Sequence, residues 1–317
     1  ITQCVACSII PLETIKKICG PTIEKLNIKI PGLLFIDSPG HAAFSNLRRR
    51  GGALADIAIL VVDINEGFKP QTIEAIEILK SDKTPFIIAA NKIDLIAGWN
   101  NDQSKGLLEN INSSPANLQE DFEKKIYELV GKFHEFGFQT ERFDRVEDYT
   151  KQLAIVPVSA LTGQGIPELL MVLTGLAQKF LEKCLECNTD GQAKGTILEV
   201  KEEKGLGVTL DVIIYDGKLK VNDTIVLGGL NQPIVTKVRS LLEPMPLMEM
   251  REKKAKFRQV KEVIAATGVK ISAPKLDGSI AGMPIRSCQP KEVNQVKEEV
   301  QKEVEEVLIE TDKEGIV

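Results

Sequence analysis

The stretch LLFIDSPGH, residues 33–41, joins a short apolar run to a polar turn. Three later apolar runs have the same form, each leading into a polar residue: 57–62 before Asp63, 86–90 before Asn91 and 154–158 before Ser159. Short continuous apolar runs are typical of strands that are buried on both faces of a parallel sheet. The polar residues therefore mark the carboxyl edge of such a sheet, where open α/β folds bind their ligands.

Helical patterns lie between these runs. Apolar residues recur at helical spacing and predict helices over Thr72–Lys80 and Leu118–Phe133, and a third over Ile166–Leu181. The polar stretch from Gly98 to Pro115 is rich in Asn and Ser and predicts a loop or a mobile insertion. We therefore expect an α/β domain with a mostly parallel sheet and helices on both faces.

The character of the sequence changes after about Asn188. Short strand patterns separated by turns predict a small antiparallel β-barrel, with strands at 193–200, 208–215 and 224–227. From Lys291 a helix is expected, with valines on one face and many Glu and Lys on the others. Such a helix needs a partner, either the barrel or a further domain. The predicted division is 1–187 for the α/β domain, 188–290 for the barrel, and 291–317 for a helix leading to an absent third domain.

The turn at residues 37–41 has the groups that sense a γ-phosphate. Asp37 follows a buried strand, so its carboxylate can reach a Mg²⁺ ion, usually through water. Gly40 has no Cβ, which lets its N–H approach a phosphate closely. The imidazole of His41 can orient a water molecule for attack, and either its neutral or its charged form suits this role.

The run Asn91-Lys92-Ile93-Asp94 is the more specific signal. The Asp94 carboxylate can accept both the N1–H and the exocyclic amine of guanine, a donor pair that adenine lacks. Asn91 can brace a neighbouring loop, and the stem of Lys92 can lie over the base. Ser159-Ala160-Leu161 ends the next strand, and the Ala160 N–H can donate to the guanine carbonyl. The predicted ligand is GTP or GDP with Mg²⁺.

The phosphate-binding loop Gly-x-x-x-x-Gly-Lys-Ser/Thr does not occur in these residues. We expect it to precede Ile1, in a P-loop-type GTPase domain that is truncated at its N-terminus. Thr2, upstream of the Asp37 turn, matches a switch segment whose hydroxyl binds Mg²⁺. The fragment alone is expected to be inactive.

Charge and composition exclude some classes. A net charge of −5 and a pI near 5.4 exclude a uniformly basic surface for nucleic acid. Local basic runs remain at Arg48–Arg50 and at Arg251–Lys261; each is either a solvated face or a contact for ribosomal RNA. No run of about 18 apolar residues predicts a membrane span, and nothing resembles a secretory signal.

The six cysteines include two C-x-x-C pairs, Cys4/Cys7 and Cys184/Cys187. Four thiolates can in principle bind zinc. Neither pair has the surroundings of a zinc ribbon, so we favour reduced thiols in a cytoplasmic protein.

With these motifs placed, the chain resembles the archaeal and eukaryotic translation initiation factor 5B family, the counterpart of bacterial initiation factor 2. The resemblance covers nearly all 317 residues and is most specific in the run Glu141-Arg142-Phe143-Asp144-Arg145-Val146. It implies a ribosome-dependent GTPase that promotes subunit joining around initiator methionyl-tRNA, with His41 positioning water. It also implies contact between the barrel and small-subunit ribosomal RNA, tRNA contact through absent domains, and contacts with other initiation factors.

Two alternatives remain. The chain could be a ribosome-binding module that hydrolyses nothing, because these residues contain no phosphate loop. It could also be a tRNA-delivering translation GTPase, which would have a different insert from residues 98–150.

Overall fold

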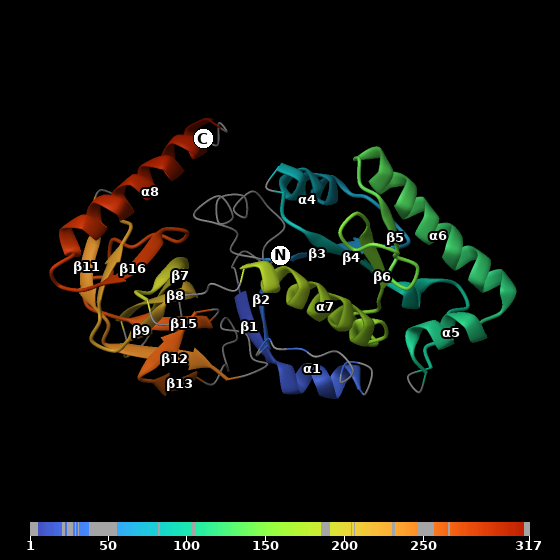
Figure 1. Cartoon of the computed structure of the whole chain (residues 1–317), viewed down its shortest axis with the longest axis horizontal. Coiled ribbons are helices and arrows are strands. Elements are labelled where there is room, and N and C mark those ends of the chain that lie inside the picture. The colour runs from blue at the N-terminus through green and yellow to red at the C-terminus, as the bar shows by residue number, and fades with distance from the viewer. Residues whose placement is uncertain are drawn as a thin grey trace. The chain divides into compact units, whose positions relative to one another are not determined.

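The computed structural model describes residues 6–20, 23, 28, 30, 32–37, 56–81, 83–102, 105–184, 191–203, 205, 207–229, 232–245, 257–265 and 267–313; for 6, 180–184 and 306–313 it describes the backbone alone. The chain forms two compact units (Figure 1). The α/β unit comprises Leu12–Pro31 and Ala55–Lys183, and the barrel unit comprises Ile1–Pro11, Gly32–Leu54 and Cys184–Val317. The two units group the N-terminal segments Ile1–Pro11 and Gly32–Leu54 with the barrel, whereas the predicted first domain runs from 1 to 187. The domain boundaries stay a prediction.

The α/β unit is built on a four-stranded parallel sheet. Its order is β3-β4-β6-β5, with β3 at Ala58–Asp63, β4 at Phe86–Asn91, β6 at Leu153–Pro157 and β5 at Thr140–Arg142. The register pairs Asp63 with Asn91 at the carboxyl edge. The three longer strands confirm the predicted runs at 57–62, 86–90 and 154–158. The three-residue strand β5 was not predicted.

The described residues of this unit form five helices that accompany the strands (Figure 1): α1 at Leu12–Cys19, α4 at Pro70–Ser81, α5 at Leu107–Ser113, α6 at Ala116–Glu135 and α7 at Ile166–Cys184. The helices predicted at 72–80, 118–133 and 166–181 are confirmed as α4, α6 and α7. The loop predicted over 98–115 is wrong where α5 forms. Leu107 and Ile111 lie one helical turn apart and are both buried, but seven residues are too few to show a period.

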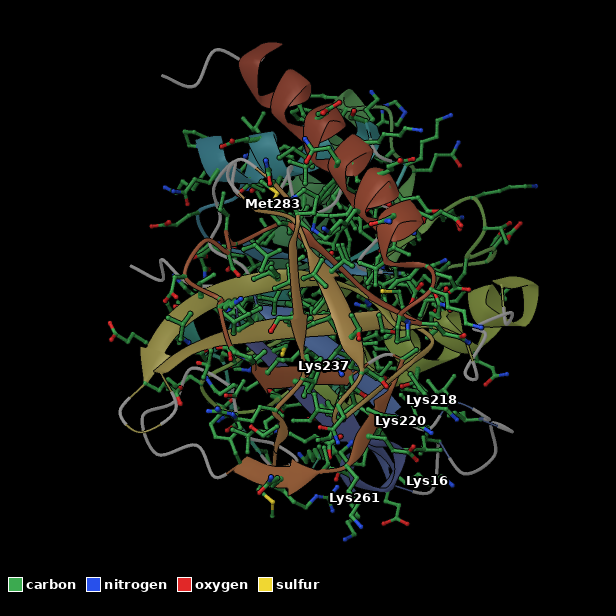
Figure 2. All side chains as sticks on the ribbon, turned by 90° about the vertical axis from the view of Figure 1, so that its left-hand side faces the viewer. Lys16, Lys218, Lys220, Lys237, Lys261 and Met283 are labelled. Atoms are coloured by element: carbon green, nitrogen blue, oxygen red, sulfur yellow. The ribbon has the colours of Figure 1, made fainter. Side chains whose placement is uncertain are left out.

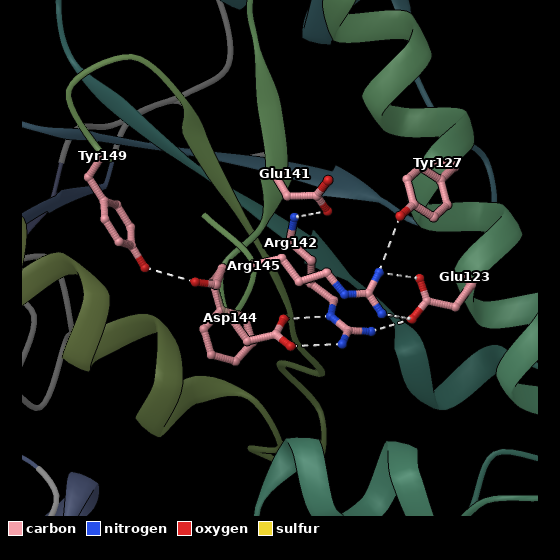
Figure 3. A network of polar contacts seen from close by, with 8 residues as sticks. Glu123, Tyr127, Glu141, Arg142, Asp144, Arg145 and Tyr149 are labelled. Carbon is pink, nitrogen blue, oxygen red and sulfur yellow. Dashed lines mark hydrogen bonds and ion pairs between the residues drawn. The ribbon is translucent and has the colours of Figure 1, made fainter. Parts of the chain in front are cut away.

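The run that supports the family resemblance forms a network of ion pairs (Figure 3). Arg142 is buried; its Nη1 lies 2.5 Å from Glu123 of α6, and its guanidinium donates two hydrogen bonds to Asp144. Arg145 adds a 2.7 Å ion pair with Glu123. Partial burial acts to raise the pKa of Asp144, but the hydrogen bond and charge of Arg142 outweigh it and lower this pKa. The network fixes α6 beside β5, which pairs with β6.

The strand predicted at Leu33–Ile36 forms, but not in the parallel sheet. This strand, β2 at Gly32–Asp37, pairs antiparallel with β1 at Ala6–Pro11, so that Ala6 lies opposite Asp37. Leu34 and Ile36 pack beside the buried Cys7 and the barrel residues Leu198 and Ile213. The apolar run therefore buries its side chains against the barrel, which the run by itself does not reveal.

The barrel unit has an eight-stranded antiparallel sheet and a separate β9–β14 pair, which confirms the predicted barrel architecture. The strands of the large sheet follow the order β11, Ile234–Lys237; β10, Thr224–Leu227; β16, Pro284–Cys288; β7, Lys194–Glu203; β8, Gly207–Asp216; β15, Thr267–Ser272; β12, Ser240–Pro244; and β13, Phe257–Val260. The small pair consists of β9, Lys218–Lys220, and β14, Glu262–Ile264. A buried lysine, Lys270, is neutralised by Glu203 at 2.7 Å and Asp211 at 2.9 Å.

The last helix, α8 at Val293–Lys313, docks on the barrel. Val296, Val300 and Val304 repeat every four residues and are buried in the barrel core. Arg286 of β16 pairs with Glu299 at 3.1 Å and with Glu303. Of the two partners left open by the sequence, the barrel is the one observed.

The thiols that the structure describes are not joined in disulfides. These are Cys7, Cys19 and Cys288; Cys4, Cys187 and the side chain of Cys184 lie outside the described residues. Burial raises the pKa of Cys7 to about 12 and that of Cys19 to about 11, so both are protonated at neutral pH. Among the described residues, no cluster of His, Cys, Asp or Glu is arranged to bind a metal, and no helix is long and apolar enough to span a membrane.

We predict that Val300→Ala destabilises the barrel unit, because Val300 is fully buried between α8 and the barrel. Removing its two methyl groups should lower the free energy of unfolding by about 2 kcal/mol. Urea denaturation followed by circular dichroism measures this change. Lys302→Ala, an exposed site on the same helix, is the matched control; equal stability of both variants would show that α8 does not depend on this packing.

Candidate guanine-recognition site

The predicted base-reading residues come together at one edge of the parallel sheet. Asn91 is the last residue of β4, and Asp94 lies in the short 3-10 helix η1 at Ile93–Leu95. Ser159, Ala160 and Leu161 follow β6, the neighbour of β4. Because the two strands are parallel, both loops begin at the same edge.

Asn91 connects the two loops directly. Its Oδ1 accepts the backbone N–H of Lys92 at 2.8 Å and that of Ala160 at 3.0 Å. Two backbone bonds support this connection, from Val158 N to Ala90 O at 2.8 Å and from Ile93 N to Val158 O at 3.3 Å. The structure therefore shows Asn91 bracing the neighbouring loop.

Lys92 is held by the end of the adjacent strand β3. It has a left-handed backbone, with φ of 69°, and its Nζ lies 2.7 Å from Asp63 Oδ2. Asn65 Nδ2 donates to the Lys92 carbonyl at 3.0 Å. Partial burial acts to raise the pKa of Asp63, but hydrogen bonds from Lys92, Asn65 and Glu66 outweigh it and lower this pKa. Asp63 was noted only as a strand end, and Asn65 was missed.

Asp94 has a carboxylate oxygen that the fold leaves unpaired. Its Oδ1 is buried, and no hydrogen-bond partner lies within reach among the described residues. A buried acceptor without a donor is costly, so such an atom is expected where a ligand or water supplies the donor. An N–H donor of a purine base fits this acceptor.

The loop after β6 is closed by its own hydrogen bonds. Ser159 is fully buried, and its Oγ accepts the Thr162 N–H at 3.2 Å. Its backbone N–H donates to the Gln164 carbonyl at 2.8 Å, and its carbonyl accepts the Gly163 N–H at 2.8 Å. Ser159 thus shapes the loop, while the side chain of Leu161 is 85% exposed.

The predicted phosphate and magnesium residues are only partly described. Asp37 ends β2 in the barrel unit and has an exposed side chain. Thr2, Gly40 and His41 lie outside the described residues, as do Arg48–Arg50. Their roles stay predictions. Within the basic run Arg251–Lys261, the structure describes 257–261, where Arg258 pairs with Glu243 at 2.8 Å.

A family comparison places this sheet edge among known folds. The family model of the elongation factor Tu GTP binding domain matches residues 16–179, just over half of the chain. The chain belongs to this family. The match includes Asn91, Lys92, Asp94 and the loop after β6, so the site described above lies within it.

Curated relatives and a solved structure extend the similarity to the whole chain. The probable translation initiation factor IF-2 of Methanopyrus kandleri is 58% identical over 320 residues, covering 100% of this chain and 54% of its own length. That of Pyrococcus abyssi is 54% identical, covering 100% of this chain and 32% of its own. The crystal structure of GDP-bound aIF5B from Aeropyrum pernix is 52% identical with a TM-score of 0.88, covering 96% of this chain and 52% of that one.

These relatives confirm the resemblance to initiation factors 5B and 2. The chain spans about half the length, or less, of the relatives described here. A more distant structure, the apo form of the elongation factor SelB from Methanococcus maripaludis, is 22% identical with a TM-score of 0.53, covering 87% of this chain and 52% of that chain. It shows the fold alone.

We predict that Asn91→Ala separates the two loops. The change removes the acceptor shared by the Lys92 and Ala160 N–H groups, so it should cost about 1–3 kcal/mol in the free energy of unfolding. Hydrogen exchange at the Ala160 amide should become faster. Asn112→Ala, an exposed asparagine in α5, is the control. Unchanged exchange at Ala160 would contradict this role of Asn91.

Proposed function

We propose that this chain binds GTP and GDP, and that it forms the nucleotide-binding part of a translation initiation factor that hydrolyses GTP on the ribosome. The buried, unpaired Oδ1 of Asp94 carries this proposal, because Asp94 belongs to one of the two loops that Asn91 joins. Membership in a GTP-binding family and similarity to IF-2 proteins along the whole chain support it.

Guanine would be recognised by its edge and covered on its faces. Asp94 accepts hydrogen bonds from N1–H and from the exocyclic amine, whereas adenine would leave the carboxylate unpaired. The Ala160 N–H donates to the base carbonyl and keeps its hydrogen bond to Asn91, so that one hydrogen is shared between two acceptors. The exposed Leu161 and the stem of Lys92 supply apolar surface for the two faces.

The phosphates and Mg²⁺ would be bound by residues that precede β1 and by residues at and after the end of β2. Asp37 offers a carboxylate at a strand end and Thr2 a hydroxyl, and oxygen ligands of this kind suit Mg²⁺. The ion would neutralise phosphate charge. Gly40 would contact the γ-phosphate through its N–H, and His41 would orient the attacking water.

The proposed partners are the ribosome and, through parts of the protein outside this chain, initiator methionyl-tRNA and other initiation factors. The proposed outcome in the cytoplasm is the joining of the ribosomal subunits. Lys218, Lys220, Lys237 and Lys261 lie on one side of the barrel (Figure 2). Lysines grouped in this way suit contact with an RNA backbone, as proposed for the barrel.

We predict that Asp94→Asn changes base preference in the full-length protein. The neutral amide accepts less strongly than a carboxylate and offers a donor that matches the C2 carbonyl of xanthine. GDP affinity should fall on the order of 100-fold, and XDP affinity should rise. Competition binding with GDP and XDP measures both. Asp121→Asn on the exposed face of α6 is the control; unchanged preference in Asp94→Asn would refute the proposed base contact.

We predict that His41→Ala preserves GTP binding but lowers ribosome-stimulated turnover by about 10²–10⁴-fold, because a positioned acid or base contributes about this factor. Single-turnover phosphate release from the full-length protein with ribosomes is the measurement. Normal turnover in the variant would exclude His41 from catalysis. No turnover in the unmodified protein would instead favour a ribosome-binding module that does not hydrolyse GTP.

A further inference from the structure

Trp99, the one tryptophan among the 317 residues, lies just after the base-reading segment. Its backbone N–H donates to the Ile96 carbonyl at 3.0 Å, and Ile96 in turn donates to Ile93 at 3.1 Å. Trp99 is therefore tied to η1, which contains Asp94, through two short turns. Its ring packs against Phe122 of α6, with centroids 5.5 Å apart.

The indole N–H of Trp99 points away from its own segment. It donates to Gln164 Oε1 at 2.8 Å, across 65 residues of sequence. Tryptophan has one side-chain donor and no acceptor, so this bond also determines which way the Gln164 amide faces.

Gln164 belongs to the second base-reading loop. Its carbonyl accepts the Ser159 N–H at 2.8 Å, as noted above, so it closes the turn that contains Ala160. The next residue, Gly165, has φ of +78°, and a Cβ there would lie 2.0 Å from the Pro157 carbonyl oxygen. The backbone that follows Gln164 is thus pressed against the end of β6 and is not free to shift.

In addition to the backbone bond from Ile93 to Val158, two side-chain hydrogen bonds join the loops, one from Ala160 to Asn91 and one from Trp99 to Gln164. We infer that the Trp99–Gln164 hydrogen bond is a positioning link that sets the distance between Asp94 and Ala160, and with it the preference for guanine. This inference rests on the proposed function. Neither residue touches the base; each acts through the loop that contains it.

A purely structural role explains the ring of Trp99 but not the amide of Gln164. Gln164 is 9% exposed, and its Nε2 is buried without a hydrogen-bond partner among the described residues. A side chain of similar volume without polar atoms, such as Met, would fill the space and avoid that unpaired donor. The amide oxygen, which accepts from Trp99, is therefore the atom that accounts for a polar side chain at this position.

The consequence for binding follows from the geometry of guanine. Its carbonyl and its N1–H and amine edge are fixed on one rigid ring, and the proposed contacts to them come from different loops. Small changes in loop spacing weaken one contact when the other is made. IDP lacks the exocyclic amine and makes one fewer contact with Asp94, so the ratio of GDP to IDP affinity reports on the alignment of Asp94.

The test uses the full-length protein that contains this chain. Trp99→Phe keeps an aromatic ring on Phe122 and removes the N–H; Gln164→Met keeps the volume and removes the acceptor. We expect each change to weaken GDP binding about 5- to 10-fold, the effect of losing roughly one hydrogen bond. The ratio of GDP to IDP affinity should fall in each variant. The double variant should be no worse than either single variant, because both remove one shared bond.

Phe122→Leu is the matched control, because it disturbs the packing under Trp99 while leaving both hydrogen-bonding groups intact. It should lower the denaturation midpoint and leave the GDP to IDP ratio unchanged. Additive effects of the two changes, or an unchanged ratio in both single variants, would overturn the link. If Trp99→Phe does not fold, as judged by circular dichroism, Gln164→Met alone decides. Equal binding of GDP and IDP by the unmodified protein would instead count against the proposed function.

Discussion

The carboxamide oxygen of Asn91 accepts two backbone N–H groups, one from Lys92 and one from Ala160, which is 69 residues further along the chain from Asn91, and the arrangement of this edge of the parallel sheet depends on it. The hydrogen bond from the Lys92 N–H requires the chain to turn sharply at Lys92, which adopts a left-handed backbone at a cost of roughly 1–2 kcal/mol. The ion pair with Asp63 and the hydrogen bond from Asn65 hold that turn in place. The hydrogen bond from the Ala160 N–H requires β4 and β6 to be parallel neighbours in the sheet, as observed.

The residues of this edge could be predicted because two simple rules coincide there. Buried strands show as apolar runs, and ligands bind at the carboxyl ends of parallel strands. Asn91, Asp94 and Ser159 satisfy both rules. Short elements such as β5 and α5 escaped prediction, because three or seven residues do not show a period. The link between Trp99 and Gln164 escaped for a different reason, since a hydrogen bond across 65 residues leaves no local pattern.

Pairing between distant segments was harder to predict than the segments themselves. The run at Leu33–Ile36 is a strand, as its apolar residues indicate, yet its partner is the antiparallel β1. An apolar run indicates that a strand is buried, but it does not indicate which element the strand is buried against. The same holds for α8, where valines spaced by four residues predicted a helix with an apolar face. Only the structure shows that the barrel covers that face.

Two charged side chains, Lys270 and Asp94, differ in whether the fold supplies partners for their buried polar atoms. In the barrel, the buried Lys270 ammonium has two carboxylates within 2.9 Å, so its charge is compensated inside the protein. At the sheet edge, Asp94 retains an acceptor with no donor among the described residues. An unpaired hydroxyl can rotate to find a partner, but a carboxylate in a fixed turn cannot. The fold therefore keeps a destabilising atom where a base could satisfy it, and it fixes the surrounding loops through Asn91 and Trp99.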